Sequence, residues 1–408
     1  MPRPHPAHSL HRFSIWLSLP QLITWGSVFY TFSLLLEPIE AELGLSRAQS
    51  SLAFSLALLA EGAAAWWVGR WIDAGHERRV MTGGSLWVGA GLLAHTQVHS
   101  VAAFYAVWVW LGLGMAATLY NPAFAVVTRR FGTEFRRAII VLTFLGGLAS
   151  TVSIPLVSWW IGLWGWPTAL AALAAVQIAL CAPLHAWLLR GAPPAPENVS
   201  AREAPGQATR PDAVRQHLRR SPFWLLTLFM VLTMLVTSAL PVHMIALLRE
   251  AGLSPSWVVG VPAAIGVLQV LGRLVLFVFE RRWNVHVANR WIPALLPAGL
   301  LVLLIGGLHP GAALLFVLLY GPANGMVTIV KGTAVAQYVS AAHVGQLNGL
   351  MSLPIALSRA AAPWWLGALW SPAGGYTLGL WSLLVASLAG VAALWLAQAR
   401  ALRTRGAH

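Results

Sequence analysis

The chain has 408 residues, of which 58% are hydrophobic and only 9% are charged. Because soluble proteins carry about 25% charged residues, this composition excludes an ordinary soluble enzyme, a disordered chain and a secreted disulfide scaffold. The formal net charge of +14 raises the question of whether the protein binds nucleic acid. The single cysteine, Cys181, excludes disulfide bonds within the chain and cysteine-based metal sites.

Twelve apolar runs lie between charge clusters and turns that contain Pro or Gly, and each approaches the length of about 20 residues that a membrane-spanning helix needs. The first six runs are 13–36, 48–69, 80–97, 101–127, 138–162 and 168–189. The second six are 222–247, 256–279, 291–308, 311–333, 348–370 and 377–398. The sequence therefore predicts an all-α integral membrane protein with twelve transmembrane helices.

One long polar stretch, 190–221, separates the two sets of spans. It is rich in Pro and Arg and shows no apolar periodicity, which is typical of a surface linker or a lateral helix. We therefore predict an N-terminal six-helix half at 1–189, a cytoplasmic linker at 190–221 and a C-terminal six-helix half at 222–408.

The basic residues predict the orientation of the chain. With the N-terminus inside, 21 of the 26 basic residues fall in cytoplasmic segments and only Arg47 and Arg249 fall outside. The remaining three, Arg273, Lys331 and Arg359, lie within spans. We expect a multi-pass protein of a bacterial-type inner membrane with both termini cytoplasmic. Because the basic residues are spread over one membrane face, they do not favour binding of nucleic acid.

The two halves contain matching segments. Residues 119–133 and 319–333 are identical at eight of fifteen positions, and the shorter pairs 159–162 with 364–367 and 44–46 with 252–254 follow a similar offset. Two parallel repeats, with substrate bound near the membrane midplane, are typical of an alternating-access transporter. The matched prolines Pro122 and Pro322 predict paired helix breaks.

The loop between spans 2 and 3 resembles a motif of the major facilitator superfamily, close to G-x-L-A-D-R-x-G-R-R. Here the loop reads G-R-W-I-D-A-G-H-E-R-R from Gly69 to Arg79, with Ala74 in place of the arginine that follows the aspartate. The resemblance covers nearly the whole chain and implies two pseudo-symmetric six-helix halves. It also implies a conformational latch at Gly69, Asp73, Arg78 and Arg79.

A narrower resemblance begins at Leu36, where L-E-P-I-E-A-E-L-G-L-S-R-A is similar to a stretch of the monocarboxylate porter and oxalate/formate antiporter branch. This branch moves small organic anions. The resemblance implies a basic substrate ligand in span 8, where Arg273 lies, and a second one in span 11, where Arg359 lies. The antiporter motif of span 5 is not met, which argues against proton-driven drug efflux.

Ionisable residues inside spans are costly and therefore candidates for function. Arg359 lies near the middle of its span and offers two parallel hydrogen bonds to a carboxylate, or else binds a neighbouring backbone carbonyl. Arg273 lies at the cytoplasmic rim in one repeat register and one turn inside the membrane in the other. The second register pairs Gln269 with Glu61 and places Gln269 one helical turn before Arg273.

Two further charges leave alternatives open. Lys331, the only lysine, either reaches the interface from the end of its span or faces the cavity. Glu61 serves as a proton carrier, as the partner of a cavity arginine or as a neutral acid bonded within its own half. His243 is a candidate proton relay, or else a histidine near the end of span 7 whose hydrogen bonds are made at the membrane interface.

The superfamily's cavity, which spans 1, 4, 7 and 10 line, implies further substrate-binding candidates. They are Trp25, Tyr30, Tyr120, Asn121, Tyr320 and Asn324.

We therefore expect a secondary transporter that moves a small organic anion, such as a carboxylate, by proton symport or anion exchange. The alternatives are an efflux pump for drugs or metabolites and, from another class, a transporter-like sensor or an integral membrane enzyme. The expected partners are the anion, protons and the lipid bilayer. We expect a monomer that needs no cofactor or metal and that is not an enzyme.

Overall fold

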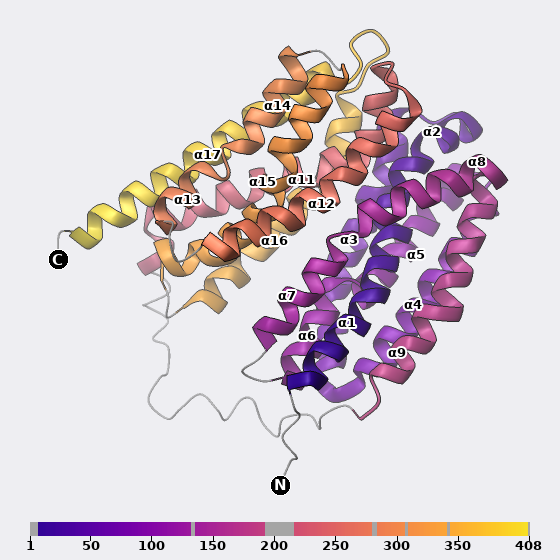
Figure 1. Ribbon diagram of the computed structural model, residues 1–408, viewed down its shortest axis with the longest axis horizontal. Helices are drawn as coiled ribbons and strands as arrows, with labels where there is room; N and C mark the ends of the chain where they lie inside the picture. The colour runs from indigo at the N-terminus through magenta and orange to yellow at the C-terminus, as the bar shows by residue number, and fades with distance from the viewer. Residues whose placement is uncertain are drawn as a thin grey trace. The chain divides into compact units, whose positions relative to one another are not determined.

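The computed structural model describes residues 7–131, 135–191, 216–279, 284–306, 309–340 and 343–406. Within these ranges the chain is almost entirely helical (Figure 1). The other regular feature among them is an isolated bridge between Ser371 and Gly375. The predicted all-α membrane fold is confirmed.

The described chain forms two compact units. The first contains residues 7–191 together with Pro241–Arg249 and Ser254–Val267. The second contains 216–240, 250–253 and the described residues from Leu268 onward. The linker predicted at 190–221 falls largely outside the described residues, so the predicted boundaries between the halves remain predictions.

The helices of the first unit include three π-helical turns, marked η. They are α1 (Ala7–Thr24), η1 (Trp25–Tyr30), α2 (Thr31–Leu43), α3 (Arg47–Trp71), η2 (Ile72–His76), α4 (Glu77–His95), α5 (Val101–Thr118), α6 (Tyr120–Phe131), α7 (Phe135–Gly146), α8 (Ala149–Val176), η4 (Gln177–Cys181) and α9 (Ala182–Leu188).

Local sequence signals explain where several of these helices begin and turn. The Ser46 hydroxyl accepts from the backbone N–H of Gln49, whose side chain in turn accepts from the backbone N–H of Ser46, and this capping box starts α3. Ser100 caps α5 in a similar way. Gly75 and Gly165 have φ values of 88° and 78°, a left-handed region that favours glycine, and both lie where the chain reverses between two predicted spans.

The predicted helix break near Pro122 is present, whereas its predicted counterpart near Pro322 is absent. Leu119, with ψ of −162°, separates α5 from α6. In contrast α15 (Pro310–Tyr338) runs without interruption through Pro322. The paired break was therefore wrong in the second half, because a proline inside a helix removes one hydrogen bond without necessarily ending the helix.

The remaining helices belong wholly or partly to the second unit. They are α11 (Ser221–Glu250), α12 (Pro255–Phe279), α13 (Val285–Trp291), α14 (Leu295–Ile305), α15, α16 (Val344–Ala368) and α17 (Thr377–Gly406). Helices α14, α15 and α17 contact one another, whereas α11 and α12 each contribute one part to the first unit and one part to the second.

Nine segments of the described chain are long and apolar enough to cross a membrane. Two of them, Arg47–His95 and Ala138–Leu188, have 49 and 51 residues, which is too long for one crossing, and they contain the turns at Gly75 and Gly165. Counting each as two crossings, and adding α16, gives a number that fits the twelve spans predicted.

Candidate functional site

Two cations of the second unit lie near enough for their charges to interact. Lys331 projects from α15 and Arg359 from α16, and both are partly buried. Their positive charges interact with each other. The sequence contains no aspartate or glutamate after Glu280. The two helices that carry these cations, α15 and α16, therefore contain no acidic residue. Because like charges repel strongly where water is scarce, an anion placed beside them would lower the free energy of the pair.

A third cation, Arg273, lies in the contact between α12 and α15. Its Nε donates a hydrogen bond to the carbonyl of Gly325 at 3.3 Å. One turn earlier on α12, Gln269 accepts a hydrogen bond from the Asn324 amide at 3.4 Å. A side chain at Gly325 would overlap the backbone of Gln269, so glycine is what allows the two helices to approach. The structure thus brings Arg273, Gln269 and Asn324 into one cluster.

The two tyrosines that the internal repeat equates lie in different surroundings. Tyr320 is fully buried between α14 and α15, where its ring stacks on Phe316 with centroids 5.0 Å apart. Tyr120 is partly exposed at the start of α6. Of these two tyrosines, Tyr120 is therefore the better placed to reach a ligand.

Tyr120 belongs to an aromatic wall in the first unit. Its ring lies 5.0 Å from that of Trp25 and stacks on Phe124 at 5.3 Å. Trp25 begins the π-helical turn η1, and Tyr30 ends it. Trp25 and Tyr30 are partly buried, whereas Asn121, next to Tyr120, is exposed. Such π-helical turns are frequent at functional sites, and this one places Trp25 against α6.

A buried polar network beside this wall contains Gln177, a residue that sequence reasoning missed. Its amide donates to Thr24 at 3.2 Å and to Ser27 at 3.3 Å. Gln21, one turn before Thr24, donates to the carbonyl of Thr118 at 2.5 Å. The signal in the sequence was a lone glutamine in the apolar run 168–189. These bonds hold α1 and η1 against η4 and the end of α5.

The two candidates for proton coupling are both buried in the first unit. Glu61 lies in α3 and is 4% exposed. His243, from the part of α11 that belongs to this unit, is fully buried, and its Nε2 lies 3.3 Å from the Ser51 hydroxyl.

The predicted latch lies where α3 turns into α4, at an end of the first unit that we call the basic end. Asp73, Arg78 and Arg79 are exposed there, and an added side chain at Gly69 would meet open space. The acid that makes ion pairs is instead Glu77, which sequence reasoning read only as part of the motif.

Glu77 is fully buried and binds two arginines of α6. Its carboxylate lies 3.3 Å from Arg129 and 2.5 Å from Arg130. Arg129 also donates to the carbonyl of Ile72, and the guanidinium of Arg130 lies 5.1 Å from the ring centroid of Phe13 in α1. The basic end is therefore held by a buried carboxylate that joins η2, α4, α6 and α1.

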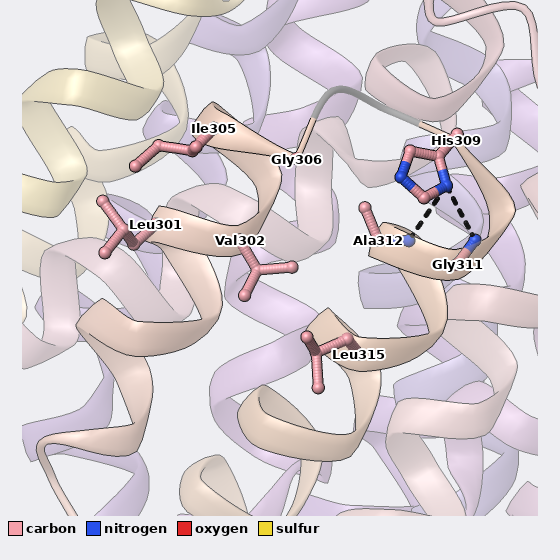
Figure 2. Close-up of a pocket in the computed structure, with 8 residues that line it drawn as sticks. All are labelled: Leu301, Val302, Ile305, Gly306, His309, Gly311, Ala312 and Leu315. Atoms are coloured by element: carbon pink, nitrogen blue, oxygen red, sulfur yellow. Dashed lines mark hydrogen bonds between the residues drawn. The ribbon is translucent and has the colours of Figure 1, made fainter.

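A groove between α14 and α15 does not suit an anion. Figure 2 shows that apolar side chains line it and that His309 lies at its edge. Its volume is about 460 Å³, and Nδ1 of His309 accepts hydrogen bonds from the backbone of Gly311 and Ala312. The imidazole therefore caps α15, and the apolar lining offers no charge to an anion.

In the part of the chain that the structure describes, no group of three His, Cys, Asp or Glu residues could hold a metal ion.

Three solved structures of transporters have a similar fold. A bacterial homologue of the human lysosomal transporter Spinster, inward-facing and unoccupied, is similar at a TM-score of 0.68 and 15% identity, with 98% of this chain and 96% of that chain covered. The nucleoside transporter NupG has a TM-score of 0.69 at 15% identity, covering 96% and 98%. The human organic anion transporter MFSD10 (TETRAN) has a TM-score of 0.64 at 18% identity, covering 96% and 100%.

At these identities the similarity shows a shared fold and says nothing about the substrate. No curated protein sequence matched the chain. The profile of the Major Facilitator Superfamily, however, matches residues 17–363, which is most of the chain. The chain therefore belongs to the Major Facilitator Superfamily, whose members are membrane transporters and not enzymes.

Proposed function

We propose that this protein moves a small organic anion, such as a carboxylate, by alternating access, through proton symport or anion exchange. The observation that carries the proposal is the pair of neighbouring cations, Lys331 and Arg359, in the second unit. Two positive charges that interact in a partly buried position are unfavourable in the empty protein. An anionic substrate would relieve that cost when it binds.

The chemistry of the two side chains suits a carboxylate. The planar guanidinium of Arg359 offers a fork of donors for bidentate binding, and Lys331 adds a compact charge. Arg273 of α12 donates a hydrogen bond to the carbonyl of Gly325 in α15. Gly325 lies six residues before Lys331 on α15. We assign Arg359 and Lys331 to the anion, with Arg273, Gln269 and Asn324 as their supporting cluster.

The test begins with purified protein and a thermal-shift screen of monocarboxylates and dicarboxylates. A ligand that binds the folded state raises the melting temperature as its concentration rises above its Kd. We expect at least one carboxylate to do so in the parent, and Arg359→Gln to abolish the shift. Arg290→Gln, which changes an exposed arginine of α13, is the matched control and should keep it. An Arg359→Gln protein that still responds to the anion contradicts the proposal.

For proton coupling we propose Glu61 as the carrier, because it is the buried carboxylate within a span of the first unit. In proteoliposomes, Glu61→Gln should leave exchange of the anion intact and remove its acceleration by a proton gradient. The same substitution at His243 separates the two candidates. Unchanged dependence on the gradient in Glu61→Gln would remove it from this role.

A second candidate function is efflux of an aromatic drug or metabolite. The observation that favours it is the partly exposed aromatic wall of Trp25, Tyr120 and Phe124, since aromatic faces stack on planar ligands. The same thermal-shift screen decides between the two if it includes nucleosides and aromatic cations. A shift with these compounds that Tyr120→Ala removes and Arg359→Gln leaves intact would favour efflux.

A further inference from the structure

A buried polar network joins α13, α15 and α17 of the second unit, and it contains none of the residues assigned to the anion. Helix α17 contacts both α13 and α15 (Figure 1). Three side chains of the network are almost fully buried, namely Asn289, Tyr338 and Gln398. The fourth, His286, is the second residue of α13 and is partly buried. Because buried polar groups need hydrogen-bond partners, the bonds of this network can be counted one by one.

The hydroxyl of Tyr338 is the centre of the network. It accepts a hydrogen bond from the Asn289 amide at 3.0 Å and another from the Gln398 amide at 3.3 Å. A hydroxyl has two acceptor positions and one proton, so these two amides occupy both acceptor positions. Nδ1 of His286 lies 3.2 Å from the same oxygen. The hydroxyl proton therefore points to Nδ1, and the neutral imidazole carries its own proton at Nε2.

The Gln398 amide has a fixed orientation and an unused acceptor. Its Nε2 donates to the carbonyl of His286 at 2.7 Å, and a flipped amide would place oxygen against oxygen. In the described part of the chain, Oε1 of Gln398 has no hydrogen-bond partner although the residue is only 1% exposed. The network therefore offers one free acceptor, and it lies on a side chain that already contacts Tyr338.

This free acceptor lets the network take up a proton. The added proton binds Nδ1 of His286, which then donates to the Tyr338 oxygen instead of accepting from it. The hydroxyl proton of Tyr338 turns to Oε1 of Gln398, whose Nε2 keeps its bond to the His286 carbonyl. The bond given up is the one from Gln398 to Tyr338, which at 3.3 Å is the longest of the set. The imidazole gains one positive charge, and the displaced hydroxyl proton keeps a partner.

The charged groups on the three helices do not supply a counter-ion. All of them are cations, and the other titratable groups are two tyrosines, Tyr320 and Tyr338. The cations are Arg290 of α13, Lys331 of α15, and Arg400, Arg403 and Arg405 of α17. The acid nearest to His286 in the chain, Glu280, lies outside the described residues. A proton bound at His286 is therefore held by the hydrogen bonds of the network.

We propose that His286, Tyr338 and Gln398 form a proton-binding site of the second unit, in which the Tyr338 hydroxyl changes from donor to acceptor toward His286 when the imidazole is protonated. Histidine is the side chain that ordinarily changes charge between about pH 5 and 8. The proposal goes beyond the proposed function, because the proton carriers considered there, Glu61 and His243, belong to the first unit. It involves no substrate, so it can fail while the anion proposal holds, and the reverse.

The test follows Tyr338 by carbon-13 NMR of purified protein labelled at the Cζ carbon of tyrosine. The chain has six tyrosines, and Tyr338→Phe identifies the signal of Tyr338. Since Cζ carries the hydroxyl, its chemical shift changes when that hydroxyl passes from donor to acceptor. We expect the Tyr338 signal of the parent to move as the pH falls from about 8 to 5. In His286→Gln the signal should stay in place, because an amide does not titrate.

Gln398→Met tests the free acceptor. Methionine keeps the length of the side chain but removes Oε1, so the displaced proton of Tyr338 would be buried without a partner. We expect about ten-fold weaker proton binding, seen as a titration displaced by about one pH unit toward acid, as for one lost hydrogen bond of ordinary strength. His309→Gln is the matched control, because His309 caps the other end of α15 and should leave the titration unchanged.

Three outcomes overturn the proposal. They are a Tyr338 signal that is constant over the pH range in the parent, a signal that moves equally in His286→Gln, and a Gln398→Met titration that coincides with that of the parent. The signals of the other tyrosines report whether each variant is folded, since they should keep their parent positions. Gln398→Leu, which also removes Oε1, takes the place of Gln398→Met where that variant alters them.

Discussion

At the scale of single residues, the fully buried carboxylate of Glu77 organises the basic end of the first unit. It pairs with Arg129 and Arg130 of α6, and Arg129 also donates a hydrogen bond to the carbonyl of Ile72. A buried ion pair is weak evidence for stability as a whole, but removing one partner leaves a charge without compensation. The end of α6 is therefore tied to the start of α4 through one carboxylate.

Glu77→Gln should destabilise the protein by about 3–5 kcal/mol, because two partly buried arginines lose their counter-charge. The measurement is thermal unfolding of the purified protein in detergent. Asp73→Asn is the control, since Asp73 is exposed in the same turn and surface changes usually stay within about 0.5 kcal/mol. Equal melting temperatures for the two variants would show that the Glu77 ion pairs carry no stability.

Lys331→Met should raise the melting temperature of the empty protein, because it removes the charge that repels Arg359 and keeps an apolar stem of similar length. The same variant should lose most of the shift that a carboxylate produces. The two effects have opposite signs, so a simple loss of folding cannot imitate them. A variant that is less stable when empty and responds fully to the anion contradicts the placement of Lys331 beside a ligand.

The pH dependence of stability should include His217, which lies before α11 and outside the membrane-spanning segments. Burial first, and then the positive charges of His343 and Arg220, lower the pKa of His217 below 6.5. Its ring lies 5.5 Å from that of His343. In the unfolded chain His217 takes up a proton more readily than in the folded protein. Folding stability therefore falls as the pH drops through 6.5.

The check compares melting temperatures between pH 7.5 and 5.5. His217→Gln should lose less stability over this interval than the parent. Arg220→Gln should fall between the two, because it removes one of the charges that oppose protonation of His217. Identical pH profiles for the parent and His217→Gln would exclude the contribution.

At this scale the sequence identified the charged residues inside spans but not their neighbours. Arg273, Lys331 and Arg359 stand out because charges are rare in apolar runs. Which of them lie together depends on the rotation and depth of three different helices, and one sequence carries no such information. For the same reason Asp73 was chosen from the motif, while burial on the helix that follows made Glu77 the acid that pairs.

At the scale of helices, the apolar runs predicted where the chain crosses the membrane, and the structure adds how the helices bend and touch. The predicted span at 13–36 became three elements, because α1 passes through the π-helical turn η1 before α2 begins. The spacing of apolar residues and the mean hydropathy are the same on both sides of such a π-helical turn, so a sequence cannot reveal it. Close helix contacts at glycine were likewise invisible, since a glycine in an apolar run has many possible causes.

The contact between α3 and α5 should depend on Gly112. An added side chain there would overlap the backbone carbonyl of Ala57 in α3, so Gly112→Ala must push the two helices apart. We expect a loss of about 1–3 kcal/mol, as for other overpacked cores. Gly62→Ala on α3 is the matched control, because it meets open space and gains up to about 1 kcal/mol of helix propensity. Opposite signs for the two variants in thermal unfolding would confirm the close approach.

At the scale of the whole molecule, composition and topology carried most of the prediction. Twelve runs, an internal repeat and the loop motif led to the superfamily that the profile match now shows. Most of the +14 net charge concerns orientation, because 21 of 26 basic residues fall on one predicted face. Composition and topology could not identify the substrate, since transporters of this fold include one for nucleosides and one for organic anions.

The orientation itself is the last prediction, and it can be measured in intact cells that produce the protein. Basic loops are retained on the cytoplasmic side, so residues at the basic end and at the C-terminus should be inside. In the Cys181→Ser background, the exposed positions Glu42→Cys and Arg403→Cys place one thiol at the end of α2 and one near the C-terminal end of α17. A membrane-impermeant maleimide should label the Glu42→Cys protein in intact cells, and the Arg403→Cys protein only after the membrane is permeabilised. The reverse pattern would place both termini outside and would contradict the predicted orientation.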